Sequence, residues 1–150
     1  MGFWSRLFGA KKENPYSISS NEVSIRDLQV ILEEIDSLWS PNSMPKKIML
    51  LQQTLSLIQC QSNPKLWAVL QVILGDSLYQ NPQGNRAENL EQAIEHYNKA
   101  LEVYTRKDFP TEWIETQNNL ANVYFIRVQG DRAENLEQAI KHYNKALEVY

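Results

Sequence analysis

Apolar residues recur at intervals of three and four positions through residues 21–62. This spacing places them on one side of an α-helix and predicts two helices, separated at Pro41, with Pro45 near the start of the second. No segment of the chain shows a clear alternation with a period of two, so we expect no sheet. The apolar stripes consist of Ile25, Leu28, Ile31, Leu32, Ile35, Leu38 and Trp39 in the first helix, and of Ile48, Leu51, Leu55 and Ile58 in the second.

Residues 84–104 and 130–150 are near-identical copies that stand 46 positions apart. The first reads GNRAENLEQAIEHYNKALEVY and the second GDRAENLEQAIKHYNKALEVY, so that they differ only at Asn85/Asp131 and Glu95/Lys141. A period of this length is typical of stacked supersecondary units, because one unit alone cannot bury its apolar face. The duplication therefore favours a surface for binding over a pocket for chemistry.

Each copy carries the apolar stripe of one helix, and a further helix is predicted before it, at about 64–80 in the first repeat and 110–128 in the second. Asn85 and Asp131 are both good N-caps for the second helix of each pair. The chain thus divides into an N-terminal segment 1–20, a capping helical pair 21–62, and two helix–turn–helix repeats, 63–106 and 107–150. The stripe of the first copy consists of Leu90, Ala93, Ile94, Tyr97, Ala100, Leu101 and Tyr104.

The second difference between the copies, Glu95/Lys141, lies opposite the apolar stripe. In the first copy Glu95 can pair with Lys99 one turn further on. In the second copy Glu137 can pair with Lys141 in the same way. Both changes are compatible with a helix whose polar face meets solvent.

Composition narrows the function classes. The 150 residues are 43% hydrophobic and 22% charged, with a formal net charge of −3, which lacks the clustered basic face of a nucleic-acid-binding protein. The single cysteine, Cys60, excludes an internal disulfide and favours a cytoplasmic location. No apolar stretch approaches the ~18 residues that span a bilayer.

The residues give little support to catalysis. His96 and His142 are equivalent positions of the duplication and lack carboxylate or thiolate neighbours at metal-ligand spacing. Gly84 and Gly130 are single glycines in turns rather than a loop that cradles phosphate. We therefore expect no enzyme, no metal and no cofactor.

The repeats resemble the tetratricopeptide repeat, whose pattern is carried by Leu120-Ala121-x2-Tyr124 with Ala139-x3-Tyr143-x2-Ala146, and by Leu74-Gly75-x2-Leu78 with Ala93-x3-Tyr97-x2-Ala100. They are especially similar to the kinesin-light-chain-type repeats of bacteria, above all those of cyanobacteria, which often accompany caspase-like protease or NTPase domains. The resemblance implies an all-α, right-handed superhelical solenoid. It also implies a non-catalytic scaffold or adaptor that binds a protein or peptide, or alternatively the regulatory arm of a larger signalling or protease system.

In that family the first helix of each pair lines the concave face and contacts peptides. The resemblance maps such contacts in the second repeat onto Glu115, Asn118, Asn119, Asn122 and Ile126, with aromatic help from Tyr124 or Phe125. Carboxamides suit this task because each offers donors and an acceptor to the backbone of an extended peptide. The alternative is that these asparagines satisfy one another and the next helix for purely structural reasons.

The first repeat is more apolar at the equivalent positions, which are Val69, Val72, Ile73, Asp76 and Gln80. Either the helices of 21–62 cover this face as a cap, which we favour, or the three apolar residues form a hydrophobic sub-pocket for a partner's side chain.

The two ends of the chain suggest further contacts. A short N-terminal helix would gather Phe3, Trp4, Leu7 and Phe8 on one face, as an anchor for a membrane surface or for a partner, unless this terminus is disordered. At the other end the last helix has no following repeat, so Ala139, Tyr143, Ala146 and Leu147 would have nothing to pack on. Either the chain is a piece of a longer array, or this end associates with another copy.

Overall fold

The computed structural model describes residues 25–149, with side chains from Leu28 onward. The N-terminal segment 1–20, with the candidate anchor residues Phe3, Trp4, Leu7 and Phe8, lies outside the described residues. Between 25 and 149 the chain forms six α-helices and one short 3-10 helix, without a strand. This confirms the expectation of an all-α protein. None of these helices is both long enough and apolar enough to cross a membrane.

The N-terminal pair consists of α2 (Ile25–Ser37) and α3 (Met44–Leu57), joined by the 3-10 helix η1 (Pro41–Ser43). Leu32 and Ile35 of α2 are buried, as is Leu51 of α3, so the two predicted stripes do face the core. Trp39 differs from the prediction: α2 ends before it, and its side chain is 79% exposed. The apolar spacing in the sequence therefore continues past the end of the helix, because α2 ends at Ser37 and a new element starts at Pro41.

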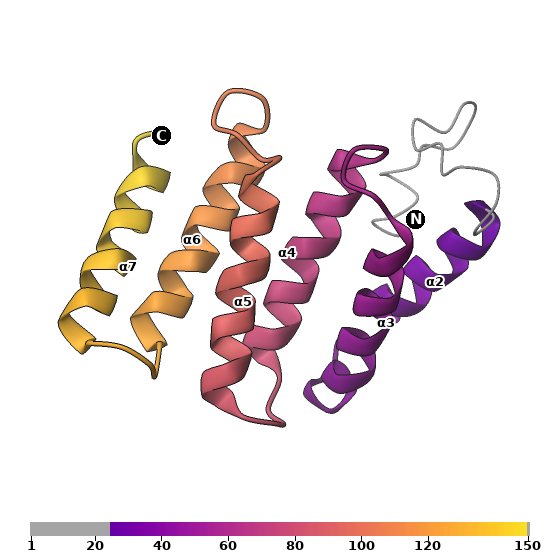
Figure 1. The fold of residues 1–150 in the computed structure, drawn as a ribbon, viewed down its shortest axis with the longest axis horizontal. Helices are drawn as coiled ribbons and strands as arrows, with labels where there is room; N and C mark the ends of the chain where they lie inside the picture. Colours follow the sequence, from indigo (N-terminus) through magenta and orange to yellow (C-terminus); the bar gives the residue numbers. More distant parts are fainter. Residues whose placement is uncertain (1–24, 150) are drawn as a thin grey trace.

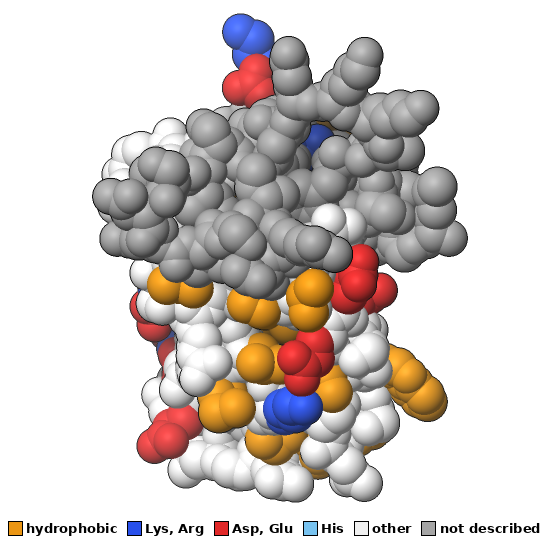
Figure 2. Space-filling view, turned by 90° about the vertical axis from the view of Figure 1, so that its right-hand side faces the viewer, with side chains coloured by type: hydrophobic (Ala, Val, Ile, Leu, Met, Phe, Trp, Pro, Cys, Tyr) orange, Lys and Arg blue, Asp and Glu red, His pale blue; other side chains and the backbone are white. Residues whose placement is uncertain are grey.

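The end of the molecule formed by α2 and α3 faces the viewer in Figure 2, which shows hydrophobic side chains among acidic, basic and polar ones on the described surface. Exposed apolar residues of this pair include Val30 on α2 and Met49 on α3.

The two repeats each form a helical pair, α4 (Pro64–Gln80) with α5 (Arg86–Leu101), and α6 (Pro110–Ile126) with α7 (Arg132–Leu147). A proline opens α4 and α6, where its missing N–H leaves no intrahelical bond unmade. Gly84 and Gly130 lie in the turns with φ of 80° and 82°, a conformation that side chains disfavour.

The turns of the two pairs repeat each other contact by contact. Asn85 accepts a hydrogen bond from the backbone N of Glu88, and Asp131 accepts one from the backbone N of Glu134, so both predicted N-caps are confirmed. In the first turn the Asn89 side chain donates to the Gln83 carbonyl at 2.9 Å, and its counterpart 46 residues on makes the same bond at 2.8 Å. The two copies therefore fold alike.

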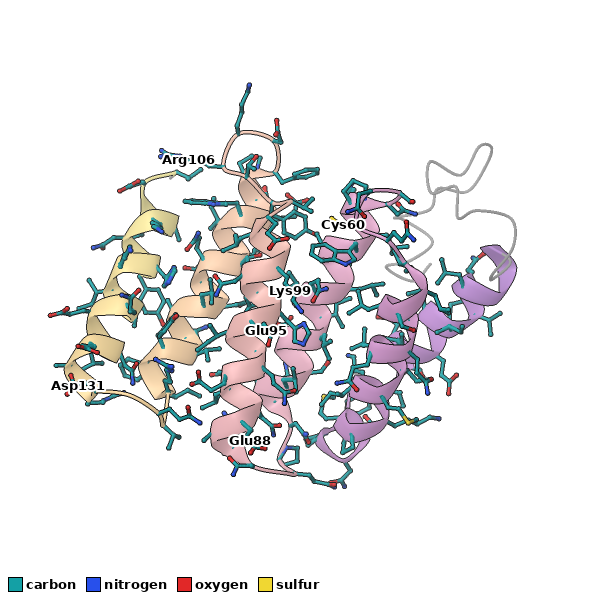
Figure 3. The ribbon with its side chains drawn as sticks, viewed as in Figure 1. Cys60, Glu88, Glu95, Lys99, Arg106 and Asp131 are labelled. Atoms are coloured by element: carbon teal, nitrogen blue, oxygen red, sulfur yellow. The ribbon has the colours of Figure 1, made fainter. Side chains whose placement is uncertain are left out.

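Glu95 and Lys99 lie on the outer side of α5, where their side chains form an ion pair at 3.0 Å (Figure 3). The corresponding pair predicted on α7, Glu137 with Lys141, is not formed among the described residues. Glu137 and Lys141 are both exposed, and an ion pair between exposed side chains contributes little to the free energy of unfolding.

Each helix packs against the next one along the chain, and α4 also touches α6 (Figure 1). One core cluster runs from Leu28 and Leu32 through α4 and α5 to Leu120 and Val123 of α6. Helices α4 and α5 approach each other closely at Gly75, where an added Cβ would stand 2.7 Å from Tyr97 Cε1. Glycine therefore makes room for this buried ring.

The last helix corrects one expectation. Ala139 and Ala146 are 2% and 1% exposed, because they face α6 of their own repeat. The large apolar residues left exposed on α7 are Ile140 and Leu147, at 58% and 63%. The alanines of the motif thus pack within their own repeat, whereas Ile140 and Leu147 lie on a side of α7 that stays exposed.

Replacement of Asp131 by alanine removes the acceptor for the Glu134 N–H at the start of α7. We expect the free energy of unfolding to fall by about 1 kcal/mol. Asp131→Asn is the matched control, because asparagine caps the equivalent helix in the first repeat. Urea denaturation followed by circular dichroism measures both, and equal midpoints for the two variants would contradict the capping role.

Candidate functional site

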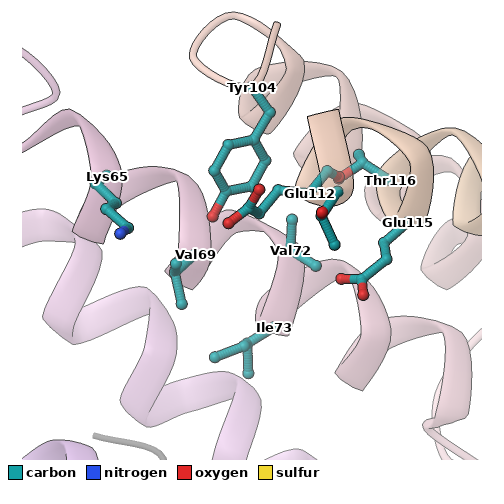
Figure 4. A pocket seen from close by; sticks show the side chains of 9 residues that line it. Lys65, Val69, Val72, Ile73, Tyr104, Glu112, Glu115 and Thr116 are labelled. Atoms are coloured by element: carbon teal, nitrogen blue, oxygen red, sulfur yellow. The ribbon is translucent and has the colours of Figure 1, made fainter. Parts of the chain in front are cut away.

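Three adjoining cavities lie along helix α4, and two of them also border α6. The largest, about 320 Å³, has a floor of Val69, Val72 and Ile73 from α4 (Figure 4). Glu112 and Glu115 of α6 stand on its far side. We call it the apolar cavity; its remaining lining residues are Lys65, Tyr104, Thr111 and Thr116.

The second cavity, about 200 Å³, is polar and is called the amide cavity. It is lined by Asp76, Tyr79, Gln80, Tyr97, Asn119 and Asn122. The third, about 170 Å³, brings in the N-terminal pair through Ile35, Asp36 and Lys47 and is called the lysine cavity. Ile73 lines both the apolar and the lysine cavity, and Asp76 and Gln80 line both the amide and the lysine cavity, so the three adjoin one another. Together they form the α4–α6 groove.

Asp76 is the polar centre of this groove. Its Oδ1 accepts a hydrogen bond from the Tyr97 hydroxyl at 2.5 Å and one from Asn119 Nδ2 at 3.2 Å. Burial raises the pKa of its carboxyl, the Tyr97 hydrogen bond and Lys47 oppose that rise, and Glu115 adds to it. The pKa of the Tyr97 hydroxyl is raised by burial and by Asp76. One carboxylate thus ties α4, α5 and α6 together.

Lys47 faces this carboxylate from α3. Burial lowers the pKa of its ammonium group, while Asp36 and Asp76 act in the opposite direction. The groove therefore contains a half-buried cation and a half-buried anion that come from different helical pairs. A ligand in the lysine cavity would meet both charges.

The duplication shows which part of this arrangement is structural. Asn122 stands 46 residues after Asp76, and it accepts a hydrogen bond from the hydroxyl of Tyr143, the counterpart of Tyr97. Both repeats therefore use this position to hold the tyrosine of the following helix. Only the first repeat does so with a carboxylate.

The residues predicted from the sequence fall into two groups. Glu115 lines the apolar cavity together with the three apolar residues of α4, and Asn119 and Asn122 line the amide cavity. The peptide-contact positions and the hydrophobic sub-pocket, predicted separately, are thus brought into one groove. Of the N-terminal pair, α3 packs on α4, and the Val69, Val72 and Ile73 side chains of α4 are only half-buried.

The other predicted residues lie elsewhere. Asn118 lines none of the three cavities. Phe125 is 51% exposed, with the Arg132 guanidinium 5.3 Å from its ring centroid. Ile126 packs against the core, and Tyr124 stacks on His142 at 5.4 Å between ring centroids.

Several groove residues were not proposed as binding residues from the sequence. Asp76 and Gln80 were available as the repeat equivalents of Asn122 and Ile126, and Glu112 lies one turn before Glu115. No signal points to Lys47, because it belongs to a helix outside the duplication. The structure alone places it in the lysine cavity.

The two histidines have structural partners. His96 Nδ1 lies 2.6 Å from Gln71 Oε1, and His142 Nδ1 lies 2.6 Å from Gln117 Oε1, so the two bonds are copies of each other. Burial lowers the pKa of both rings. The pKa of His142 falls to about 4, and the positive charges of Lys145 and Lys141 contribute to this fall. Residues 25–149 contain no group of histidine, cysteine and acidic side chains that could hold a metal ion.

Comparison of the chain with protein-family models, with curated proteins and with solved structures found no match in any of the three.

Replacement of Asp76 by alanine leaves the buried Tyr97 hydroxyl without its acceptor. We expect the free energy of unfolding to fall by about 1–3 kcal/mol. Asp76→Asn retains the acceptor oxygen, as Asn122 does in the second repeat, and should preserve most of that stability. Asn122→Ala is a second control with a smaller expected loss, since Tyr143 is less buried than Tyr97. Equal loss from Asp76→Ala and Asp76→Asn in chemical denaturation would contradict this role.

The depressed histidine pKa values predict acid sensitivity. An unfolded histidine takes up its proton near the ordinary value of 6.5, whereas folded His142 resists protonation until about pH 4. Stability is therefore complete above the unfolded pKa and declines between about pH 6.5 and pH 4, by roughly 1–2 kcal/mol for this residue. His142→Gln should flatten the decline, measured as the difference in unfolding free energy between variant and wild type at each pH. A difference that does not change with pH would refute the assignment.

Proposed function

We propose that this chain is a non-catalytic scaffold that binds an extended polypeptide along the α4–α6 groove. The observation that supports the proposal is that an apolar cavity and an amide-lined one both lie between α4 and α6, across the two repeats. Such a surface offers an anchor for a side chain and hydrogen-bonding groups for a backbone, the combination that peptide recognition uses. The tetratricopeptide-like pattern and the duplicated turn contacts support a superhelical solenoid as the scaffold.

The apolar cavity suits one large aliphatic or aromatic side chain. Its volume of about 320 Å³ lies at the lower end of the range of ligand pockets, and Val69, Val72 and Ile73 supply an apolar floor. The opposite wall, with Glu112 and Glu115, is acidic. A peptide bound here would therefore place its hydrophobic residue next to a basic one.

The amide cavity suits the peptide backbone. Asn119 donates one N–H to Asp76, and the Asn122 side-chain oxygen accepts a hydrogen bond from the Tyr143 hydroxyl. A carboxamide has two N–H donors and an oxygen with two lone pairs, so both residues retain capacity for a ligand. Their structural bonds hold the side chains in place, and a preorganised side chain loses less entropy on binding.

Charge favours a cationic partner. Asp36, Asp76, Glu112 and Glu115 line the groove, against Lys47 and Lys65. The excess of carboxylates attracts basic peptides and repels acidic ones. We therefore assign to the partner an extended segment with a hydrophobic residue flanked by lysine or arginine.

Peptide-display selection on the immobilised chain, followed by fluorescence anisotropy, tests the groove. The double variant Asn119→Ala/Asn122→Ala should bind the selected peptides at least about tenfold more weakly, since two backbone contacts of about 1 kcal/mol each are lost. Asn118→Ala is the control on the same helix, because that residue lies outside the cavities. Equal affinities for all three proteins would exclude the groove as the binding surface.

Reversal of charge at Glu115 tests the preference for basic peptides. Glu115→Lys should weaken binding of a lysine-flanked leucine peptide about tenfold and strengthen that of a glutamate-flanked one. Glu95→Lys is the matched control, because the second repeat carries lysine at that position and the residue faces solvent on α5. A Glu115→Lys protein that keeps the wild-type preference would remove the charge assignment.

A further inference from the structure

The apolar cavity of the α4–α6 groove has a partly exposed apolar floor and an acidic wall. Val69, Val72 and Ile73 form the floor, and their side chains are only half-buried. Glu112 and Glu115 stand on the opposite side (Figure 4), and neither forms an ion pair with a side chain of residues 25–149. The cavity therefore offers apolar area and negative charge to an occupant, and both gain from a further contact.

The first twelve residues of the chain have the complementary composition. They read MGFWSRLFGAKK and contain the four large hydrophobic anchor candidates, three cations at Arg6, Lys11 and Lys12, and no carboxylate. The formal net charge of this segment is +3, so the rest of the chain carries −6 within the total of −3. The segment thus has the chemistry that the groove requires of a partner, a hydrophobic residue flanked by lysine or arginine.

The order of residues in this segment also fits the cavity. In an extended segment alternate side chains point to the same side, so that Trp4, Arg6 and Phe8 share one side. One of the two rings can then enter the apolar cavity, while the guanidinium two residues away meets Glu112 or Glu115. Arginine suits this position because its planar fork pairs with a carboxylate through two hydrogen bonds.

The segment is long enough to reach the groove from the start of α2. The rise of a helix places Ile25 about 17 Å from Asp36, which lines the lysine cavity. Along α4 the groove extends about 17 Å from Gln80 to Val69. Residues 9–24 span up to about 50 Å when extended, which exceeds these two lengths together.

We propose that residues 3–12 occupy the α4–α6 groove of their own chain and compete there with an external peptide. The proposal rests on the groove as the peptide-binding surface proposed above, and it adds the regulation of that surface. A tethered segment acts at an effective concentration on the order of millimolar, so that even a contact of modest affinity keeps the groove occupied. A partner must therefore outcompete the segment, or the segment must be withdrawn, before the groove is free.

Paramagnetic broadening of amide signals in the full-length chain tests the docking. A nitroxide is attached at Ser5→Cys in a Cys60→Ser background, because Ser5 points away from the side that bears Arg6 in an extended segment. We expect the amide signals of Val69, Val72 and Asn119 to lose at least about half of their intensity, since the tether keeps most grooves occupied. A mixture of nitroxide-labelled chain with isotope-enriched chain that lacks the nitroxide should show no such loss. Loss in the mixture would overturn a contact within one molecule.

Charge reversal shows whether the contact is specific. Arg6→Glu should restore the groove signals, and Glu112→Lys/Glu115→Lys in that variant should weaken them again, because the two sides then carry opposite charges once more. Arg6→Glu with Glu95→Lys is the matched control, since the second repeat carries lysine at that position and the residue faces solvent on α5. Groove signals that the wild-type segment leaves unchanged, or a loss that Arg6→Glu does not affect, would overturn the proposal.

Fluorescence anisotropy with a peptide selected for the groove separates this proposal from the function of the groove itself. The full-length variant Trp4→Ser/Arg6→Glu should bind the peptide at least about tenfold more tightly than wild type, because its own segment no longer competes. Equal and measurable affinities would overturn the internal docking and leave the groove as a binding surface. Signal loss from the Ser5→Cys label without any peptide binding would refute the proposed function and leave the internal contact.

A lipid surface is the competing assignment for the segment. Vesicles of phosphatidylcholine and phosphatidylglycerol provide the probe, and co-sedimentation of the full-length chain is the measurement. Co-sedimentation that Trp4→Ser/Arg6→Glu abolishes, together with groove signals that the nitroxide leaves unchanged, would assign residues 3–12 to a membrane and would overturn the proposal.

Discussion

The structure depends on one constraint: a helical pair of this kind can bury only part of its apolar surface by itself. The alanines of its second helix face the first helix of the same pair, whereas Ile94 and its counterpart Ile140 are buried only where another pair covers them. Ile94 and Ile140 show the two outcomes, since they are chemically equivalent and are 9% and 58% exposed. A methylene group removed from water contributes about 0.8 kcal/mol, so a neighbouring pair that covers such a face adds to the stability of the pair beneath it.

The same dependence on a neighbour shapes the groove. Asp76 belongs to α4, yet its hydrogen bonds reach Tyr97 of α5 and Asn119 of α6. A buried carboxylate is costly unless it is hydrogen-bonded, and here the bonds come from two other helices. The carboxylate therefore fixes the spacing of the first repeat against the second. It also gives the groove a negative charge, whereas Asn122, at the equivalent position of the second repeat, is neutral.

Gly75 and Ala121 illustrate how a near-duplicate can diverge at a close contact. The first repeat places a glycine under the Tyr97 ring, where a Cβ would stand 2.7 Å from Cε1. The second repeat has alanine at that position, and its tyrosine, Tyr143, is only half-buried. The buried tyrosine, Tyr97, is the one that donates to the Asp76 carboxylate. The glycine beneath the ring and the carboxylate that holds it therefore occur together in the first repeat.

The sequence by itself determined the helices, the turn glycines, the N-caps and the duplication, because these follow from local chemistry and from periodicity. It also placed Glu115, Asn119 and Asn122 on one face of a helix, since residues three and four apart share a face. Only the tertiary structure decided that Val69, Val72 and Ile73 meet that face in one cavity, and that Lys47 lies opposite Asp76. These contacts join residues from separate helices, and the identical stripes of α5 and α7 show why no local pattern reveals them: burial is set by the neighbour a helix has, which its own sequence does not contain.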